Sequence, residues 1–534
     1  MGSEHGITRR RLLQTGAQGA VAVSGLALLG GGSAATGYAA VSAAAAKPVR
    51  GGTLNVSIMS GGTAETLNPA QIAAYPDLLR QYQLYDLLFT VSDTVAVANR
   101  LVTSAESNKS ATVWTFHLRD GVTWHNGKSF SADDVVYTFH TWSSPTNFGN
   151  AAIAGVVDFK NVRKLNRLTV QVPLLTPVAA FPSLLSSYTS FVVQNGATSS
   201  SFKTHPIGTG PFKFVSFTPG QRSVFARNPN YWEHGKPYVD QLIIDSSFTD
   251  ETTRLNALLA GDNNVLALMP AAEWTEQKAA GRVTVLSSPA PQNYEICMRV
   301  DKAPFTDVRV RQAMKLIPDR QAIVNGAFSG LAEVGNDLMG GCKQFTVPFF
   351  DSSATPTHDP EKAKALLKAA GHSGLTFTLP IAPAGPGYVQ AGTIFAQQAK
   401  AAGVNVVLQN LPSSAYYQYP LYPNRPIQVS STQVFPSLAS AYRAFFVTGA
   451  SEGETHWGSP THDKLINQAI SAVNEKLAAE MWHGVQQQQL SQGGEIVFAE
   501  AYFTDAVANS VHGIKAGPGY FLNNWRLLDG WIGK

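Results

Sequence analysis

The sequence predicts a large protein in which strands and helices are mixed, of α/β or α+β class. Its 534 residues, of which 44% are hydrophobic, suffice for roughly two to four domains with sizeable cores. Residues Gly51–Ile58 alternate between apolar and polar side chains and lead to Gly61-Gly62, which is typical of a buried strand that feeds a loop. Capped helical segments follow along the chain, so both kinds of element are expected throughout.

Turns and a helix start are expected between Val113 and Phe139. The dipeptides Asp120-Gly121 and Asn126-Gly127 are typical of tight turns between short strands. Ser131 is followed three residues later by Asp134, the spacing of a capping box, which satisfies backbone N–H groups where a helix begins. The stretch therefore predicts short strands followed by a helix.

Later helices are marked by their ends. Asp359-Pro360 has the pattern of an N-cap followed by a first-turn proline, and Gly371 is a stop signal. Further elements are expected as helices over residues Tyr388–Ala402, Thr461–Val473 and Glu475–Gln492, and as a strand over Val404–Leu408.

The N-terminus has the pattern of an export signal, residues 1–46. Arg9-Arg10 and Leu12-Leu13 resemble a twin-arginine motif, and the apolar run Ala17–Leu29 leads to the small residues Ala43–Ala46. The run is short for a membrane span of ~20 residues, and an uncleaved anchor is the alternative. We expect an exported protein, in the periplasm or at the cell surface. With no cysteine near the cleavage region, no lipid attachment is expected there.

Composition and motifs exclude several function classes. The net charge of +4 is small for this length and argues against a nucleic-acid-binding surface. HExxH, CxxC and glycine-rich phosphate-loop patterns are absent, and neither a metal site nor an enzyme is expected. Cys297 and Cys342 are the two cysteines. In an exported protein they are expected to form either a disulfide or two buried thiols.

Five segments, in order along the chain, resemble the family 5 solute-binding proteins of ABC importers, the group that includes dipeptide- and oligopeptide-binding proteins. These segments are Thr115–Phe139, Pro206–Phe212, Arg227–Trp232 with its continuation Gly235–Tyr238, Pro304–Ala313, and Asp359–Gly371. One departure is Pro318-Asp319-Arg320, where the family usually has an apolar residue before Asp-Arg.

The resemblance implies an α/β fold of two lobes joined by a hinge, like that of periplasmic binding proteins, with a subdomain inserted in the first lobe. The expected ranges are 47–70, 205–289 and 511–534 for the first lobe, 71–204 for the subdomain, and 290–510 for the second lobe. Closure about the hinge traps a small solute, which a monomer then delivers to importer permease subunits without a cofactor. A receptor or chaperone without an importer, and a secreted hydrolase, are the competing interpretations.

Candidate ligand-binding residues follow from this resemblance. The loop after the first strand contributes Ser60, Gly61, Gly62 and Thr63. The second lobe contributes aromatic and polar groups, for which the candidates are Tyr294, Tyr388, Phe435, Arg443 and Trp457. For each of these second-lobe residues, the alternative to a ligand-binding role is a position in the core or on the surface.

An acid-free stretch bears on the kind of solute. Residues Lys362–Ser451 contain no Asp or Glu, although peptide-binding relatives hold the ligand amine with an aspartate in the corresponding region. A buried ammonium group without a carboxylate is unfavourable by several kcal/mol. A neutral or anionic solute is therefore expected, for which Arg425 and Arg443 are suited. The alternative is a peptide whose amine is held from the first lobe by Glu65.

Overall fold

The computed structural model describes residues 47–533 except 73, 187, 271–272, 342–346, 355, 419–420, 433, 451 and 518–520. Contacts divide the chain into two units, Met1–Lys47 and Pro48–Lys534, and the fold below is that of the second unit. The predicted export signal, residues 1–46, lies outside the described residues. Within the described part of the chain, no helix has the length and apolar character needed to cross a membrane.

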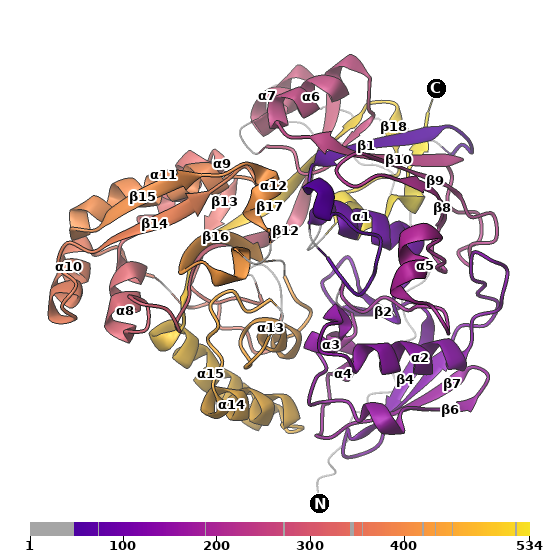
Figure 1. Cartoon of the computed structure of the whole chain (residues 1–534), viewed down its shortest axis with the longest axis horizontal. Helices are drawn as coiled ribbons and strands as arrows, with labels where there is room; N and C mark the ends of the chain where they lie inside the picture. Colours follow the sequence, from indigo (N-terminus) through magenta and orange to yellow (C-terminus); the bar gives the residue numbers. More distant parts are fainter. Residues whose placement is uncertain are drawn as a thin grey trace, which may run out of the picture. The chain divides into compact units, whose positions relative to one another are not determined.

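The largest sheet has nine strands in the order β16-β12-β17-β11-β1-β10-β9-β8, with β13 paired to β17. Their bounds are β1 Thr53–Met59, β8 Phe212–Phe217, β9 Arg222–Arg227, β10 Gln241–Phe248, β11 Val265–Leu266, β12 Val283–Met298, β13 Ala332–Val334, β16 Ile427–Thr432 and β17 Glu495–Ala508. β1 pairs in parallel with β10 and β11, whereas β12 pairs antiparallel with β16 and β17. The mixed sheet and the helices around it confirm the predicted α/β class (Figure 1).

The first predicted strand is confirmed with a shift of one or two residues at its ends. Leu54, Val56 and Ile58 of β1 are at most 1% exposed, because alternate side chains of a strand point to the same buried face. Their neighbours in the core include Leu78 and Leu79 of helix α1 (Tyr75–Leu84). α1 therefore packs with the first lobe, although the sequence places residue 71 onward in the inserted subdomain.

The inserted subdomain contains a four-stranded antiparallel sheet in the order β4-β5-β7-β6. These strands are β4 Val102–Ser107, β5 Val113–Leu118, β6 Arg163–Asn166 and β7 Thr169–Pro173. Helix α2 (Ala132–Trp142) begins after Ser131 with the predicted capping box, in which the Ser131 N–H donates to Asp134 Oδ2 at 2.9 Å. Helices α3 (Phe148–Ala151) and α4 (Phe181–Leu184) complete the side that faces α13 (Leu438–Phe445) (Figure 1).

The second lobe contains a parallel pair, β14 (Thr376–Ile381) and β15 (Asn405–Asn410), connected through helix α11 (Tyr388–Ala399). The predicted helix ends are close to those observed. Asp359 caps α10, and α15 has the predicted bounds. Helices of this lobe are α8 Val308–Leu316, α9 Arg320–Phe328, α10 Pro360–Ala369, α12 Ser413–Tyr416, α14 Pro460–Ser471 and α15 Glu475–Gln492.

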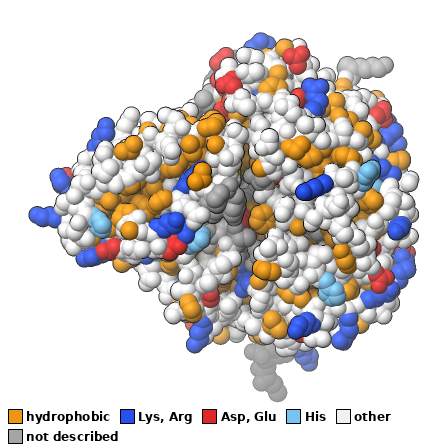
Figure 2. All heavy atoms as spheres, in the orientation of Figure 1, with side chains coloured by type: hydrophobic (Ala, Val, Ile, Leu, Met, Phe, Trp, Pro, Cys, Tyr) orange, Lys and Arg blue, Asp and Glu red, His pale blue; other side chains and the backbone are white. Residues whose placement is uncertain are grey.

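Short elements connect these parts. They are α5 Ser199–Thr204, α6 Glu251–Ala260, α7 Trp274–Ala280, α16 Phe521–Trp525, β2 Phe89–Val91, β3 Val97–Asn99, β18 Val511–His512 and β19 Trp531–Ile532. On the face shown in Figure 2, Lys and Arg side chains are dispersed and interspersed with acidic ones, without forming one continuous basic stripe.

Two long strands, β12 and β17, run through both lobes side by side. Val283–Ser287 of β12 pairs with β17 in the first lobe, and Asn293–Met298 lies between β16 and β17 in the second. The register shifts between Ser287 and Pro291, which is also where the sequence places the lobe boundary. The lobe boundaries themselves stay predictions.

Candidate functional site

The loop after β1 lies against the second lobe, as its predicted role requires. The Gly61 N–H donates to Glu65 Oε1 at 2.8 Å, and the Gly62 N–H donates to Ser60 Oγ at 3.0 Å. Gly62 has a φ of +73°, and a Cβ built on it lies 3.3 Å from the Cβ of Ser414 in α12. Ser60–Thr63 is therefore part of the boundary between the lobes.

Glu65 is already engaged within the first lobe. Its Oε2 accepts hydrogen bonds from Arg80 Nη1 at 2.7 Å, from the Gly220 N–H at 2.9 Å and from Ser246 Oγ at 2.9 Å, while Oε1 accepts from Gly61. Both partners of the Arg80–Glu65 ion pair have side chains with no exposed surface. Glu65 thus serves contacts within the first lobe, and the alternative in which it holds a ligand amine stays a prediction.

A hydrogen-bonded group of side chains joins the lobes. Ser431 Oγ of β16 accepts from Tyr388 OH and from Gln292 Nε2, each at 2.8 Å. Tyr75 OH, at the start of α1 in the first lobe, lies 3.4 Å from Ser431 Oγ and 3.4 Å from Gln292 Nε2. These contacts place the start of α1 beside strands β12 and β16.

Five tyrosines continue from this group, with neighbouring ring centroids 4.9–6.1 Å apart. We call them the tyrosine row: Tyr294, Tyr388, Tyr416, Tyr417 and Tyr422. The hydroxyls of Tyr388 and Tyr417 lie 3.1 Å apart. Of the predicted ligand-binding residues, Tyr294 and Tyr388 are brought together here, both only 1% exposed.

Glu454 stands at the end of the tyrosine row. Its Oε1 accepts hydrogen bonds from Ser430 Oγ at 2.8 Å and from Tyr422 OH. Its Oε2 is buried and receives no N–H or O–H donor from the described residues, the remaining neighbour being the Cys297 thiol. Burial raises the pKa of Glu454 to about 8, so the carboxyl is mostly protonated at neutral pH.

A carboxyl group thus lies beside β16, and the expectation that the second lobe offers no carboxylate to the solute stays a prediction. The acid-free stretch does contain β16, but Glu454 follows its end by three residues and folds back onto Ser430. The tyrosine row, Glu454, Tyr75 and Ser431 together are called the tyrosine–glutamate cluster below.

This cluster lies where Tyr75 of α1 meets Ser431 of β16. Tyr75, Tyr417 and Glu454 each keep partial accessible surface. Burial nevertheless raises the pKa of all three groups. We therefore take the cluster as the candidate solute site.

Three other predicted residues lie elsewhere. Phe435 and Trp457 pack into the core, against Phe445 at 5.8 Å and His462 at 4.0 Å between ring centroids. The guanidinium of Arg443 donates to protein acceptors, including the Ala152 carbonyl at 3.0 Å. None of these three belongs to the tyrosine–glutamate cluster, and their ligand-binding roles stay predictions.

Cys297 is a buried free thiol whose pKa is raised by burial. Its expected disulfide partner, Cys342, lies outside the described residues. The pairing of these two cysteines therefore stays a prediction.

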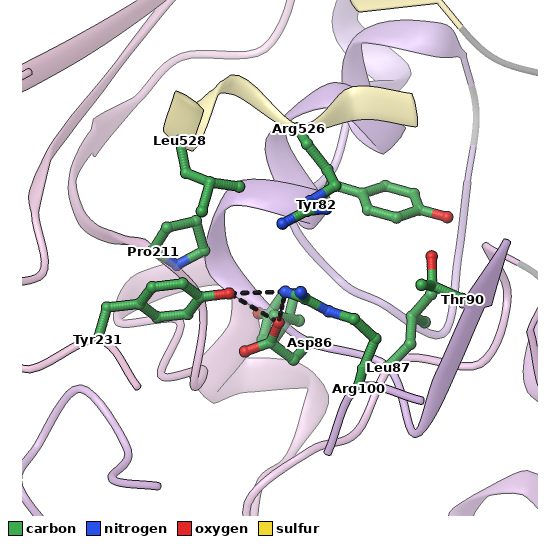
Figure 3. A pocket seen from close by; sticks show the side chains of 10 residues that line it. Tyr82, Asp86, Leu87, Thr90, Arg100, Pro211, Tyr231, Arg526 and Leu528 are labelled. Atoms are coloured by element: carbon green, nitrogen blue, oxygen red, sulfur yellow. Dashed lines mark hydrogen bonds and ion pairs between the residues drawn. The ribbon is translucent and has the colours of Figure 1, made fainter. Parts of the chain in front are cut away.

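A small hollow lies around Arg100 (Figure 3). Arg100 Nη2 donates to Asp86 Oδ1 at 2.9 Å and to Tyr231 OH at 2.7 Å. Tyr231 belongs to the predicted segment Arg227–Trp232, and Pro211 belongs to Pro206–Phe212. Because the charged groups here are paired with one another, this hollow is a scaffold feature that motif residues build.

Comparisons with known proteins agree with this architecture. The family model "Bacterial extracellular solute-binding proteins, family 5 Middle" matches residues 96–453. The periplasmic oligopeptide-binding protein OppA of Salmonella typhimurium is 25% identical over 512 residues, 89% of this chain and 88% of that protein. Heme-binding protein A of Haemophilus influenzae is 29% identical over 297 residues, 51% of this chain and only 53% of that protein.

Solved structures share the fold at low identity. AgaA from A. tumefaciens R10 with agropinic acid has a TM-score of 0.80 at 20% identity, covering 90% of this chain and 99% of that one. DppA from Helicobacter pylori with the peptide STSA has a TM-score of 0.80 at 18% identity, covering 91% and 99%.

The chain belongs to the bacterial extracellular solute-binding proteins of family 5. It is a solute-binding protein of the kind that delivers small solutes to ABC importers, and the relatives are transport proteins. The two-lobed fold expected from the five segments is confirmed.

Proposed function

We propose that this chain captures a small solute carrying a positively charged nitrogen in the tyrosine–glutamate cluster and delivers it to the permease subunits of an ABC importer. The proposal includes export through the twin-arginine signal, action as a monomer and no catalytic step. Its main support is Glu454, a carboxyl group at the end of the tyrosine row that accepts hydrogen bonds from Ser430 and Tyr422 and has no Lys or Arg within 4 Å among the described residues.

Charge compensation supports a cationic nitrogen. An enclosed carboxyl ionises only when a positive charge comes close, and the described residues place no Lys or Arg within 4 Å of Glu454. A solute nitrogen with N–H donors would supply that positive charge. The faces and hydroxyls of the tyrosine row add cation–π attraction and hydrogen bonds to such a group.

Arg425 supports the inference that the same solute also carries an acidic group. Its guanidinium carbon lies 4.7 Å from the ring centroid of Tyr416 and 5.8 Å from that of Tyr422. Its Nη1 is buried and has no hydrogen-bond partner among the described residues. Tyr422 contacts both Arg425 and Glu454, so a basic and an acidic group flank one ring, which suits a zwitterion such as a peptide or an amino-acid conjugate.

The test is a thermal-shift screen of refolded, solute-stripped protein with matched solute pairs. Each pair contains a free amine and its N-acetylated form, in dipeptides, tripeptides and sugar–amino-acid conjugates. Stabilisation by the free amines and not by their acetylated forms is expected. Equal stabilisation by acetylated or purely anionic solutes would refute the cationic assignment and restore the neutral or anionic solute expected from the acid-free stretch.

A further inference from the structure

The strongest contact between the inserted subdomain and the second lobe lies away from the solute site. Arg443 of α13 is 5% exposed. Its Nε donates to the Ala152 carbonyl at 3.0 Å, and its Nη2 donates to the Ala154 carbonyl. Its Nη1 donates to Asn467 Oδ1 of α14 at 3.0 Å. One side of the guanidinium is thus held by its own lobe and the other by the subdomain.

The subdomain acceptors are carbonyls that a short helix leaves free. Ala152 is the C-cap of α3, a helix of only four residues, and the last carbonyls of a helix have no partner within it. Cationic side chains are favourable at this end of a helix. The sequence Ala152-Ile153-Ala154 therefore presents two acceptors to one guanidinium.

The surroundings of this contact are largely apolar. One hydrophobic cluster runs without interruption from the subdomain, with Phe116 and Phe139, to the second lobe, with Leu438 and Tyr442. Beside it, Ser183 Oγ of α4 lies 2.7 Å from Ser437 Oγ, the N-cap of α13. Figure 1 shows α13 next to α3 and α4.

Arg443 has no ion-pair partner within 4 Å among the described residues. Burial lowers the pKa of Arg443 to about 10, which still leaves the guanidinium charged at neutral pH. A charged group buried without a carboxylate is favourable only while its hydrogen bonds are intact. Removing those bonds also leaves two buried carbonyls without donors.

We propose that Arg443 links the subdomain to the second lobe through its hydrogen bonds. It thereby sets the balance between open and closed forms, independently of which solute binds. Its partners, Ala152, Ala154 and Asn467, are not members of the tyrosine–glutamate cluster. Arg443 is therefore a positioning residue, because it acts on the solute site through closure.

The experiment measures lobe separation without solute. Spin labels are placed by Leu165→Cys in β6 and Val473→Cys after α14, side chains that are 49% and 64% exposed. Single-label proteins report any labelling of the native thiols. Electron–electron distance measurements then compare wild type, Arg443→Gln and the matched control Arg311→Gln. Arg311 is 7% exposed and donates only within the second lobe, to Phe305, Thr306 and Gln492 carbonyls.

Arg443→Gln should shift the distances upward and reduce the ratio of closed to open protein by about tenfold or more, as expected for the loss of two charge-assisted hydrogen bonds. Arg311→Gln should lower thermal stability and leave the distances unchanged. Asn467→Ala, which keeps the subdomain bonds, is the second variant and should give an intermediate shift. Wild-type distances in Arg443→Gln, or in Asn467→Ala if Arg443→Gln does not fold, would overturn the proposal. No solute is present, so the result is independent of the solute class.

Discussion

Glu454 makes solute binding depend on pH in a direction that can be calculated. With a pKa of about 8, the carboxyl is ionised in about 1% of free molecules at pH 6 and in about half at pH 8. A cationic solute binds the ionised form. Its affinity should therefore rise about 50-fold between these pH values, provided that the solute's own amine stays protonated.

Calorimetric titration provides the assay. The amine that responds best in the thermal-shift screen is titrated at pH 6, 7 and 8 in two buffers with different ionisation enthalpies. About one proton should leave the protein for each solute bound at pH 7, because Glu454 is then about nine-tenths protonated before binding. Glu454→Gln should abolish both the proton release and the pH dependence. At pH 8 it should weaken binding by about 1.5–3 kcal/mol, the range for a hydrogen bond to a charged group.

The stability of the free protein should change with pH in the opposite direction. The folded-state pKa of Glu454 is raised above its unfolded value, so between about pH 4.5 and 8 the folded protein binds more protons than the unfolded chain. The contribution of this group to stability is thus fully present at low pH and is lost as pH rises. A binding affinity that is constant from pH 6 to 8, without proton release, would refute this account of the site.

Three further predictions concern other parts of the chain. Glu65→Gln removes the nearer of two carboxylates beside the buried Arg80, Asp77 remaining at 3.9 Å, and chemical denaturation should show a loss of roughly 3 kcal/mol; a loss below 1 kcal/mol would contradict the buried pair. Replacing Arg9 and Arg10 by lysine should keep the protein in the cytoplasm in cell fractionation, and unchanged export would exclude the twin-arginine signal. If Cys297 and Cys342 are bridged, mass spectrometry after non-reducing alkylation should find no modified thiol.

Local patterns predicted local structure well. The capping box at Ser131 and the ends of α15 at Glu475 and Gln492 were predicted closely, because caps and turn residues act within a few positions. The five ordered segments predicted the two-lobed fold. The boundary near residue 71 stays a prediction, and nothing local shows that α1 packs with the core of the main sheet.

The site was less predictable because its contacts are long-range. The Tyr416-Tyr417 pair and Tyr422 were visible in the acid-free stretch, and this concentration of tyrosines was the available signal. The return of Glu454 to Ser430 depends on the fold of the intervening helix α13. Likewise, Arg443 meets carbonyls almost 300 residues earlier in the chain, a pairing that no sequence spacing reveals.

The paired strands β12 and β17 restrict how the lobes can move. Their ladder extends from Val283 opposite Ala508 to Cys297 opposite Glu495. Sliding one strand by a single residue would break these hydrogen bonds and turn every side chain to the other face, so translation of the lobes along the ribbon is costly. Twisting costs less, because register shifts between Ser287 and Pro291 and between Tyr294 and Glu295 interrupt the regular pairing. The ribbon thus favours rotation of the lobes over translation.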